Sequence, residues 1–247
     1  LYGAKVVEVE FKREENFQVD VKVLAEVAKK KKAKLVVLCN PNNPTGQVIY
    51  RDEVLWLAEE IKRVNCYLLV DEAYVELTKL HDKISVLKES SSTENLIAVR
   101  SLTKTYAIPG LRIGFAVSST CISTVLEKLV HKWSVNSLAL FILPVLLENK
   151  DYLERARELI FLERPKLAQR LRDMGVVSKV HPSDANYLLL KVNTDGLKLK
   201  QHLLSRFKIL VRVCMGFKGL GRSYLRIAVK KPKENNLLIK AFSSLPP

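Results

Sequence analysis

The chain has 247 residues, 48% of them hydrophobic and spread along the whole sequence, which excludes a disordered protein and predicts a buried core. No apolar stretch reaches the roughly 20 residues that cross a bilayer, and no basic-then-apolar leader is present, so we expect a cytoplasmic protein without a membrane partner. The net charge of +15 would suit nucleic acid or anionic small molecules, but no aromatic-and-basic stripe accompanies the lysines, so we expect no nucleic-acid partner.

The four cysteines lie far apart and form no CxxC pair or Cys/His cluster with the spacing of metal ligands. They are Cys39, Cys66, Cys121 and Cys214. We therefore expect free thiols in a reducing compartment and no bound metal.

The first half of the chain alternates predicted helices with short apolar runs. Residues 19–32 are predicted to form a helix with Asp20 as its N-cap, and Asp52 is predicted to cap a second helix that ends near Val64. Four apolar runs are predicted to be strands buried on both faces: residues 35–39, 67–70, 96–99 and 113–117. This order predicts a doubly wound α/β domain with a mainly parallel sheet over residues 1–150.

The second half is predicted to lead through a helical connection into a smaller domain. Residues 120–173 are largely helical in pattern, with Pro144 and Pro165 expected to bend or divide them, and residues 151–174 form the connecting helix. Residues 175–247 are predicted to form a small C-terminal α+β domain. Its predicted elements are strands at 176–180, 187–192, 209–213 and 224–229, a helix at 197–206 and another from Pro232.

Polar clusters follow the predicted strands. They are residues 40–46 (NPNNPTG), 71–74 (DEAY), 101–104 (SLTK) and 110–114 (GLRIG). In a doubly wound sheet, ligands bind at the carboxyl ends of the strands, so we expect chemistry where these clusters meet.

Each motif alone has an ordinary structural explanation. The DEAY cluster could end the strand of an ATPase, but the sequence has no GxxxxGK[ST] phosphate loop. The NPNNPTG cluster could be a surface turn, because Asn, Pro and Gly favour turns, and Arg226 could be an ordinary arginine on a strand. The order and spacing of the motifs together make these explanations insufficient.

In this order, the clusters resemble the fold type I pyridoxal-5'-phosphate (PLP) enzymes of the class I/II aminotransferase family. The resemblance implies that Lys104 holds the cofactor as a Schiff base and moves a proton between the substrate and the cofactor. Such a lysine needs a lowered pKa, which a partly buried site with cationic neighbours would provide. Asp71 matches the aspartate that keeps the pyridine nitrogen protonated.

The remaining cofactor contacts are also implied by the resemblance. Asn43 and Tyr74 match the residues that bind the phenolic oxygen of the cofactor. Ser101, Thr103 and Arg112 match the residues that bind its phosphate, because hydroxyls and a guanidinium fork suit a dianion.

Two strands near the C-terminus carry the implied substrate contacts. Arg226 resembles the arginine that binds the substrate carboxylate, and Asn186 resembles its helper. Arg212 is a hypothetical partner for the phosphate of a phosphorylated substrate; alternatively, it pairs with a structural carboxylate. Glu72 should point away from Asp71 along an extended chain, so we expect no catalytic role for it. The histidines lie outside the motifs and are expected to be structural or on the surface: His81, His131, His181 and His202.

Within the family, the likeness is strongest to threonine-phosphate decarboxylase and histidinol-phosphate aminotransferase. Residues 133–139 (WSVNSLA) approximate both, while residues 212–220 and 226–230 look more like the decarboxylase. The resemblance therefore implies a threonine-phosphate decarboxylase-like enzyme of cobalamin synthesis that acts on an amino acid or phosphorylated amino acid. A histidinol-phosphate or other class I/II aminotransferase is the alternative. Family members usually work as homodimers.

The likeness begins part-way into the large domain of the family, so the glycine-containing phosphate loop and the ring that stacks on the cofactor have no counterpart here. We expect a weaker grip on the cofactor and an exposed sheet edge. A non-catalytic fragment that retains the fold is therefore the alternative from another class.

Overall fold

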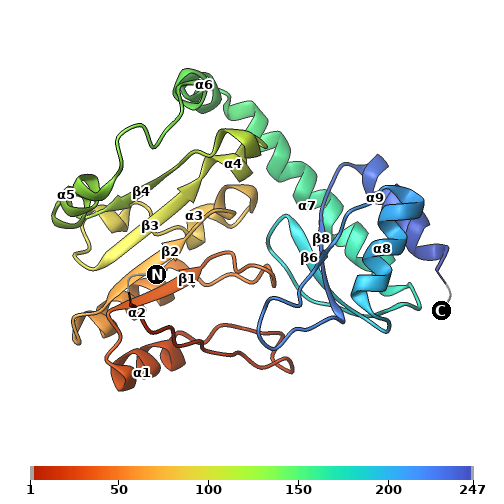
Figure 1. Cartoon of the computed structure of the whole chain (residues 1–247), viewed down its shortest axis with the longest axis horizontal. Coiled ribbons are helices and arrows are strands. Elements are labelled where there is room, and N and C mark those ends of the chain that lie inside the picture. The colour runs from red at the N-terminus through yellow and green to blue at the C-terminus, as the bar shows by residue number, and fades with distance from the viewer. Residues whose placement is uncertain (1–2, 246–247) are drawn as a thin grey trace.

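Two sheets form the frame of the protein, and the long helix α7 (Lys150–Arg172) joins them (Figure 1). The computed structural model describes residues 3–245. The first sheet has the spatial order β1 (Leu35–Cys39), β2 (Tyr67–Asp71), β3 (Leu96–Ser101) and β4 (Gly114–Ser118). The second has the order β5 (Val177–Val180), β6 (Tyr187–Val192), β8 (Tyr224–Ala228) and β7 (Arg212–Val213).

The first sheet is mainly parallel, as predicted. β2 pairs in parallel with both β1 and β3, whereas β4 runs antiparallel to β3. A parallel connection needs a crossover, and the helix α2 (Arg51–Lys62) supplies the one between β1 and β2. The chain therefore brings the carboxyl ends of β1, β2 and β3 to one edge of the sheet.

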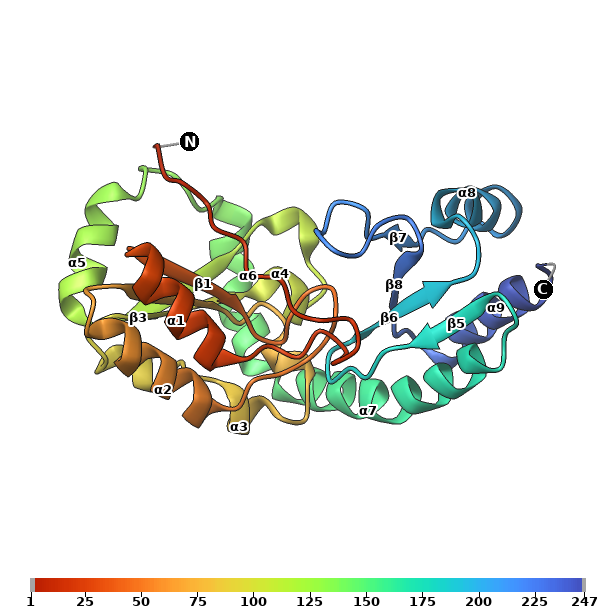
Figure 2. The ribbon, with the colours of Figure 1, turned by 90° about the horizontal axis from the view of Figure 1, so that it is seen from below.

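The helices α1 (Val21–Lys31) and α2 lie side by side and cover one face of this sheet (Figure 2). Leu68, Val70 and Ala98 point into that core and are fully buried. On the other face, the paired residues Leu35 and Tyr67 are 48% and 46% exposed. The prediction that all four strands are buried on both faces is therefore wrong, because no helix among residues 3–245 covers that side of β1.

Local signals set the helix starts. Asp20 caps α1, and its carboxylate accepts a hydrogen bond of 2.8 Å from the amide of Lys22, as predicted. The cap predicted at Asp52 is wrong. The N-cap of α2 is Tyr50, and the carboxylate of Glu53 accepts a hydrogen bond from its amide. Asp52 lies in the first turn, where a negative charge still favours the helix.

Three helices follow β4: α5 (Thr120–Leu129), α6 (Ser137–Glu148) and α7. Pro144 and Pro165 were predicted to bend or divide the helices; both lie inside continuous helices, α6 and α7, so neither proline divides its helix. The breaks occur instead before and after α6, where the side chains of Asn136 and Asn149 accept hydrogen bonds from the first turns of α6 and α7.

The second sheet packs against α7, α8 (Gly196–Phe207) and α9 (Pro232–Ser243) around one core. Leu171, Leu190, Leu203 and Leu225 are fully buried in it. The strand β7 is shorter than predicted. Among residues 3–245, no helix is both long enough and apolar enough to cross a membrane.

The segment before α1 reaches across to the second sheet. Arg13 Nε donates a hydrogen bond of 2.8 Å to the carbonyl of Gly219, and Glu10 pairs with Lys218. The Phe17 ring packs against Tyr224. These contacts join the two halves of the molecule on the side away from α7.

The short elements of the chain are α3 (His81–Ile84), α4 (Leu102–Thr105), η1 (Val75–Leu77), η2 (Glu89–Ser91) and η3 (Pro109–Leu111).

Candidate functional site

The candidate site lies on the open face of the first sheet, at the carboxyl ends of the parallel strands. Asp71 ends β2 and pairs with Val99, and Ser101 lies two residues farther along β3. Residues two apart on a strand, and residues paired across strands, share a face. Asp71 and Ser101 therefore point to the same side of the sheet, away from α1 and α2.

Cys39 shares this face, because it pairs with Asp71 from β1. Burial, followed by the nearby charge of Asp71, raises the pKa of the Cys39 thiol to about 12. A neutral thiol is a poor nucleophile. Among residues 3–245, no group of His, Cys, Asp and Glu side chains could hold a metal ion.

The turn after β1 is held in shape by its own side chains. The buried Asn40 amide donates to the carbonyl of Ile49 and accepts from its amide, at 2.8 and 3.0 Å. Gly46 has a φ of +76°, and a Cβ there would stand 2.0 Å from Ser183 Oγ, so only glycine fits. The turn therefore presents Asn43 in a defined position.

Arg226 of β8 reaches the turn from the second sheet. Its Nη1 donates a hydrogen bond of 2.7 Å to Asn43 Oδ1. Two residues predicted to bind substrate and cofactor, and separated by 183 positions, are thus in direct contact. Asp71 Oδ1 accepts a hydrogen bond of 2.9 Å from the amide of Ala73, which orients this carboxylate.

Tyr187 links these groups, and sequence reasoning gave it no role. Its hydroxyl donates to the carbonyl of Asn42 at 2.9 Å, its ring lies edge-on to Tyr74 at 5.1 Å, and the guanidinium of Arg226 lies 5.1 Å from the ring centre. Burial raises the pKa of Tyr187, so the hydroxyl remains a donor. The only sequence signal was its position directly after Asn186.

The hydroxyls predicted to bind phosphate are adjacent, because Ser101 Oγ and Thr103 Oγ1 lie 2.6 Å apart. Lys104 follows in α4 and is exposed, in contrast to the expected partly buried lysine. Arg112 is also exposed, and it donates to the carbonyl of Pro109 at 3.2 Å. The chain around Lys104 and Arg112 thus leaves both cations open to solvent.

The two other predicted substrate residues lie on either side of β8: Asn186 directly precedes β6, and Arg212 begins β7. Asn186 Oδ1 is buried and has no hydrogen-bond partner among residues 3–245. Arg212 pairs in register with Arg226, and its guanidinium lies 5.4 Å from the ring centre of Phe217. No carboxylate of the described residues is within ion-pair distance of Arg212, so a structural carboxylate does not explain it.

These groups fit the cofactor that the resemblance implies. Adjacent hydroxyls suit a phosphate, and an accessible amine suits an aldehyde. The carboxylate of Asp71 suits a protonated ring nitrogen. The oxygen of Asn186 is a buried acceptor without a partner among residues 3–245.

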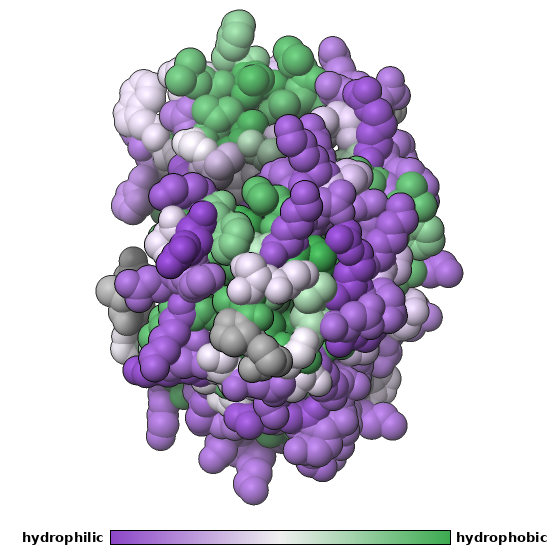
Figure 3. Space-filling view, turned by 90° about the vertical axis from the view of Figure 1, so that its right-hand side faces the viewer, coloured by the Kyte–Doolittle hydropathy of each residue, from purple (hydrophilic) through white to green (hydrophobic). Residues whose placement is uncertain are grey.

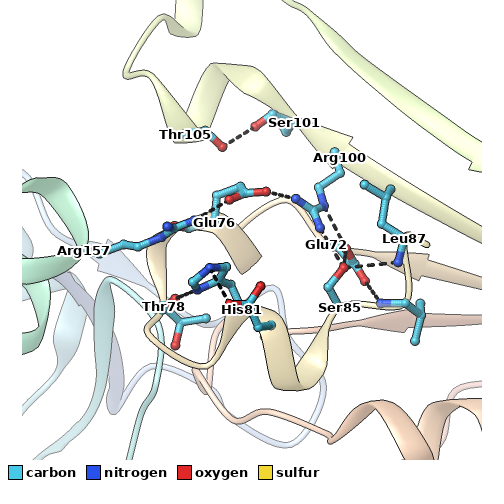
Figure 4. Close-up of polar contacts among 12 residues, drawn as sticks. Glu72, Glu76, Thr78, His81, Ser85, Leu87, Arg100, Ser101, Thr105 and Arg157 are labelled. Atoms are coloured by element: carbon cyan, nitrogen blue, oxygen red, sulfur yellow. Dashed lines mark hydrogen bonds and ion pairs between the residues drawn. The ribbon is translucent and has the colours of Figure 1, made fainter. Parts of the chain in front are cut away.

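Glu72 points away from the site, as predicted. It is buried, and its carboxylate accepts hydrogen bonds from Val86 and Ser85 and pairs with Arg100 (Figure 4). His181 is a buried residue packed against Phe17, and burial lowers its pKa to about 4. The remaining histidines lie outside the contacts that form the candidate site.

A family model described as aminotransferase class I and II matches residues 1–242. The bifunctional adenosylcobalamin biosynthesis protein CobDQ of Leptospira interrogans is 36% identical over 243 residues, which cover 97% of this chain and 27% of the relative. Histidinol-phosphate aminotransferase 2 of Archaeoglobus fulgidus is 35% identical over 233 residues, covering 94% and 63%.

A solved structure agrees with these relatives. The L-threonine-O-3-phosphate decarboxylase of Porphyromonas gingivalis superposes with a TM-score of 0.76 and 30% identity, covering 85% of this chain and 64% of that one. The chain therefore spans less than two thirds of the length of each of these proteins.

Proposed function

The chain belongs to the class I and II aminotransferase family, and from this we propose that it works as a PLP-dependent enzyme on an amino acid or phosphorylated amino acid. The observation that carries the proposal is the contact of Arg226 with Asn43. It supports a site in which a group for the substrate carboxylate lies beside a group for the cofactor.

When bound, PLP supplies an aldehyde that an amine can attack and a ring that withdraws electrons from the α-carbon of the substrate. Lys104 provides the amine and carries a proton to or from that carbon. The Asp71 carboxylate holds a proton on the ring nitrogen. Ser101, Thr103 and Arg112 bind the phosphate.

Asn43 and Tyr74 bind the phenolic oxygen of the cofactor in this proposal. Arg226 binds the substrate carboxylate as a fork, and the Tyr187 ring supports the guanidinium from below. Asn186 offers its free oxygen to a donor of the ligand.

A substrate with a second anionic group is favoured by Arg212. This arginine stands beside Arg226 in the sheet and has no carboxylate partner among the described residues, so a phosphate could use it. We favour a threonine-phosphate decarboxylase-like reaction, because the residues 212–220 resemble that subgroup. Family likeness further supports a homodimer that works in the cytoplasm.

Transamination of histidinol phosphate or of an amino acid is the second candidate, and the likeness to the Archaeoglobus relative favours it. Both reactions use the same cofactor contacts. For an amino-acid substrate, the bond that breaks at the α-carbon depends on the angle at which Arg226 and its neighbours hold the carboxylate. Histidinol phosphate has no carboxylate, so it can only be transaminated.

The test starts with the purified chain, PLP and borohydride reduction. We expect a visible absorbance band that borohydride bleaches, and mass spectrometry should find the reduced cofactor on Lys104. Lys104→Ala should lose both signals. A wild-type chain without the band would instead be a fragment that retains the fold and does not hold the cofactor by itself.

Threonine phosphate and histidinol phosphate then separate the two reactions. Release of carbon dioxide from threonine phosphate supports the decarboxylase, and transfer of the amino group from histidinol phosphate to an added 2-oxo acid supports the alternative. Arg212→Ala should raise the KM for the phosphorylated substrate, and an unchanged KM would remove its proposed role.

A further inference from the structure

Four charged side chains form a buried ion-pair chain behind the candidate site (Figure 4). Glu72 pairs with Arg100 at 2.8 Å, Arg100 also pairs with Glu76, and Glu76 pairs with Arg157 at 2.6 Å. The side chains of Glu72, Arg100 and Arg157 are at most 10% exposed. The catalytic proposal above uses none of these residues.

Further hydrogen bonds fix the two ends of the ion-pair chain. Glu72 Oε1 accepts from the amide of Val86 at 2.6 Å, and Ser85 Oγ lies between Glu72 and Arg100, at 2.9 and 2.7 Å. At the other end, Arg157 Nε donates to the carbonyl of Glu76 at 2.7 Å. The buried charges are thus paired and hydrogen-bonded, which is the condition under which burial of charge is tolerated.

Two members of the ion-pair chain are next to candidate cofactor residues in the sequence. Glu72 follows Asp71, and Arg100 precedes Ser101. Arg100 and Ser101 are consecutive residues of β3 and point to opposite faces of the sheet. The ion-pair chain therefore holds the ends of β2 and β3 together from the covered face, while Asp71 and Ser101 stand on the open face.

The other half of the ion-pair chain acts on two further segments. Glu76 lies in η1, which begins directly after Tyr74. Arg157 lies in α7, and α7 leads to the sheet that carries Arg226. A fixed link between η1 and α7 therefore constrains the placement of Tyr74 relative to the second sheet.

A purely stabilising role does not explain this arrangement well. Buried ion pairs can often be replaced by apolar residues of similar volume without loss of stability, whereas their geometry is specific. A misplacement of about 1 Å in a site can cost about a hundredfold in rate. Accurate placement of the strand ends is thus the larger benefit of four linked charges, three of them buried, at this location.

We propose that Glu72, Glu76, Arg100 and Arg157 are positioning residues that set the relative placement of Asp71, Tyr74 and Ser101. The inference rests on the proposed function, because it takes these three residues as cofactor contacts. If the proposal holds, breaking the ion-pair chain weakens the binding of PLP more than it lowers the stability of the fold.

The experiment compares Arg100→Met and Arg157→Met with Lys79→Met. The control breaks the pair between Lys79 and Glu158, which also joins the segment after β2 to α7 but is exposed, with side chains 43% and 51% accessible. Two quantities are measured on the whole chain: the Kd for PLP, and the hydrogen exchange of residues 71–78 and 101–105 without cofactor.

We expect both arginine variants to raise the Kd by about tenfold, the lower end of the loss when groups that orient direct ligands are removed. Hydrogen exchange in the two segments should become faster. Arg100→Lys keeps the charge without the fork and should fall between Arg100→Met and the wild type. Lys79→Met should leave both quantities unchanged.

Arginine variants that lower the melting temperature but leave both the Kd and the exchange within twofold of the wild type would overturn the proposal. If Arg100→Met does not fold, Arg157→Met decides, because its partner Glu76 is partly exposed. A wild-type chain that does not bind PLP would count against the proposed function, and the exchange data would still decide whether the ion-pair chain positions the strand ends.

Discussion

The helix α8 and the helix α6 have equal length but opposite surroundings. α8 is the more polar in sequence, yet it buries Leu199 and Leu203. α6 is almost entirely apolar, yet Ala139 is its one buried residue. Phe141 of α6 is 84% exposed. An apolar sequence is therefore not sufficient for burial, because burial requires a second surface of matching shape.

The same difference extends to the regions around the two helices. The second sheet and the covered face of the first sheet form dense cores, whereas α5 has no buried residue and Trp133 is 95% exposed. Hydrophobic residues gather at the top of the molecule in Figure 3, where Figure 1 places α6. We call residues 114–149 the uncovered segment.

The candidate site spans both regions. Asp71, Tyr74 and Arg226 lie at the packed side and are half-buried, whereas Lys104 and Arg112 are exposed. Ile113, directly before the uncovered segment, packs with Ala139 of α6. We call the part of the site with Asp71, Tyr74 and Arg226 its carboxylate side, and the part with Lys104 and Arg112 its lysine side. The contrast indicates that the carboxylate side is the better ordered of the two.

The largest change in the free energy of unfolding is expected when a buried leucine of α8 is compared with an exposed leucine of α6. Leu203→Ala in α8 should lower the free energy of unfolding by about 2–5 kcal/mol, because the residue is fully buried. Leu138→Ala in α6, where the leucine is 71% exposed, should change it by less than about 0.5 kcal/mol. Urea unfolding measures both. Equal losses would mean that α6 is covered in solution and would break the comparison.

A pH effect is expected at the packed junction of the N-terminal segment and the second sheet. Burial, with smaller contributions from Lys179 and Lys191, lowers the pKa of His181 from 6.5 to about 4. Between these values, the unfolded chain binds a proton that the folded chain does not. The free energy of unfolding should therefore fall as the pH falls, by at most about 1.4 kcal/mol per pH unit.

His181→Phe should remove this contribution, because phenylalanine keeps the ring contacts with Phe17 and Tyr224 but does not titrate. Urea unfolding at pH 7 and pH 5 measures the difference between variant and wild type. The same loss of stability in both proteins would show that water reaches His181.

A smaller effect is expected at Tyr187, on the packed side of the site. Tyr187→Phe removes the hydrogen bond to the carbonyl of Asn42 and should cost about 1 kcal/mol. Tyr67→Phe is the matched control, since Tyr67 is 46% exposed, and it should have almost no effect. Thermal unfolding measures both variants. If the two changes were equal, the carboxylate side of the site would be no better ordered than the surface.

The smallest change in stability is expected in the uncovered segment itself. Phe141→Lys should leave the free energy of unfolding within about 0.5 kcal/mol of the wild type and reduce the binding of a hydrophobic dye. Leu204→Lys replaces a single exposed leucine on α8 and should leave dye binding unchanged. Undiminished dye fluorescence in Phe141→Lys would place the accessible apolar surface elsewhere.

Local patterns were sufficient to predict most elements of the fold. The five-residue run at β1 and the Asp20 cap of α1 both depend on neighbouring residues, so they can be read from a short stretch of sequence. The motifs also indicated the family, because their order along the chain is itself a sequence property. The start of α2 was misjudged, since Asp52 and Glu53 both suit a helix start and only the hydrogen bond of Glu53 decides between them.

Contacts between distant residues could not be predicted in this way. Arg100 lies 28 residues from Glu72, and Arg157 lies 81 residues from Glu76, so no local pattern indicates that these charges pair. Tyr187 was missed for the same reason, because its role depends on Asn42, Tyr74 and Arg226.

The sequence by itself determined where most strands and helices form, which motifs follow the strands, and the family to which the chain belongs. Only the tertiary structure decided which face of the first sheet is covered, which apolar helix remains exposed, and which buried charges pair. The physical reason is that backbone preferences act over a few residues, whereas burial and ion pairing depend on neighbours that only the folded chain brings together.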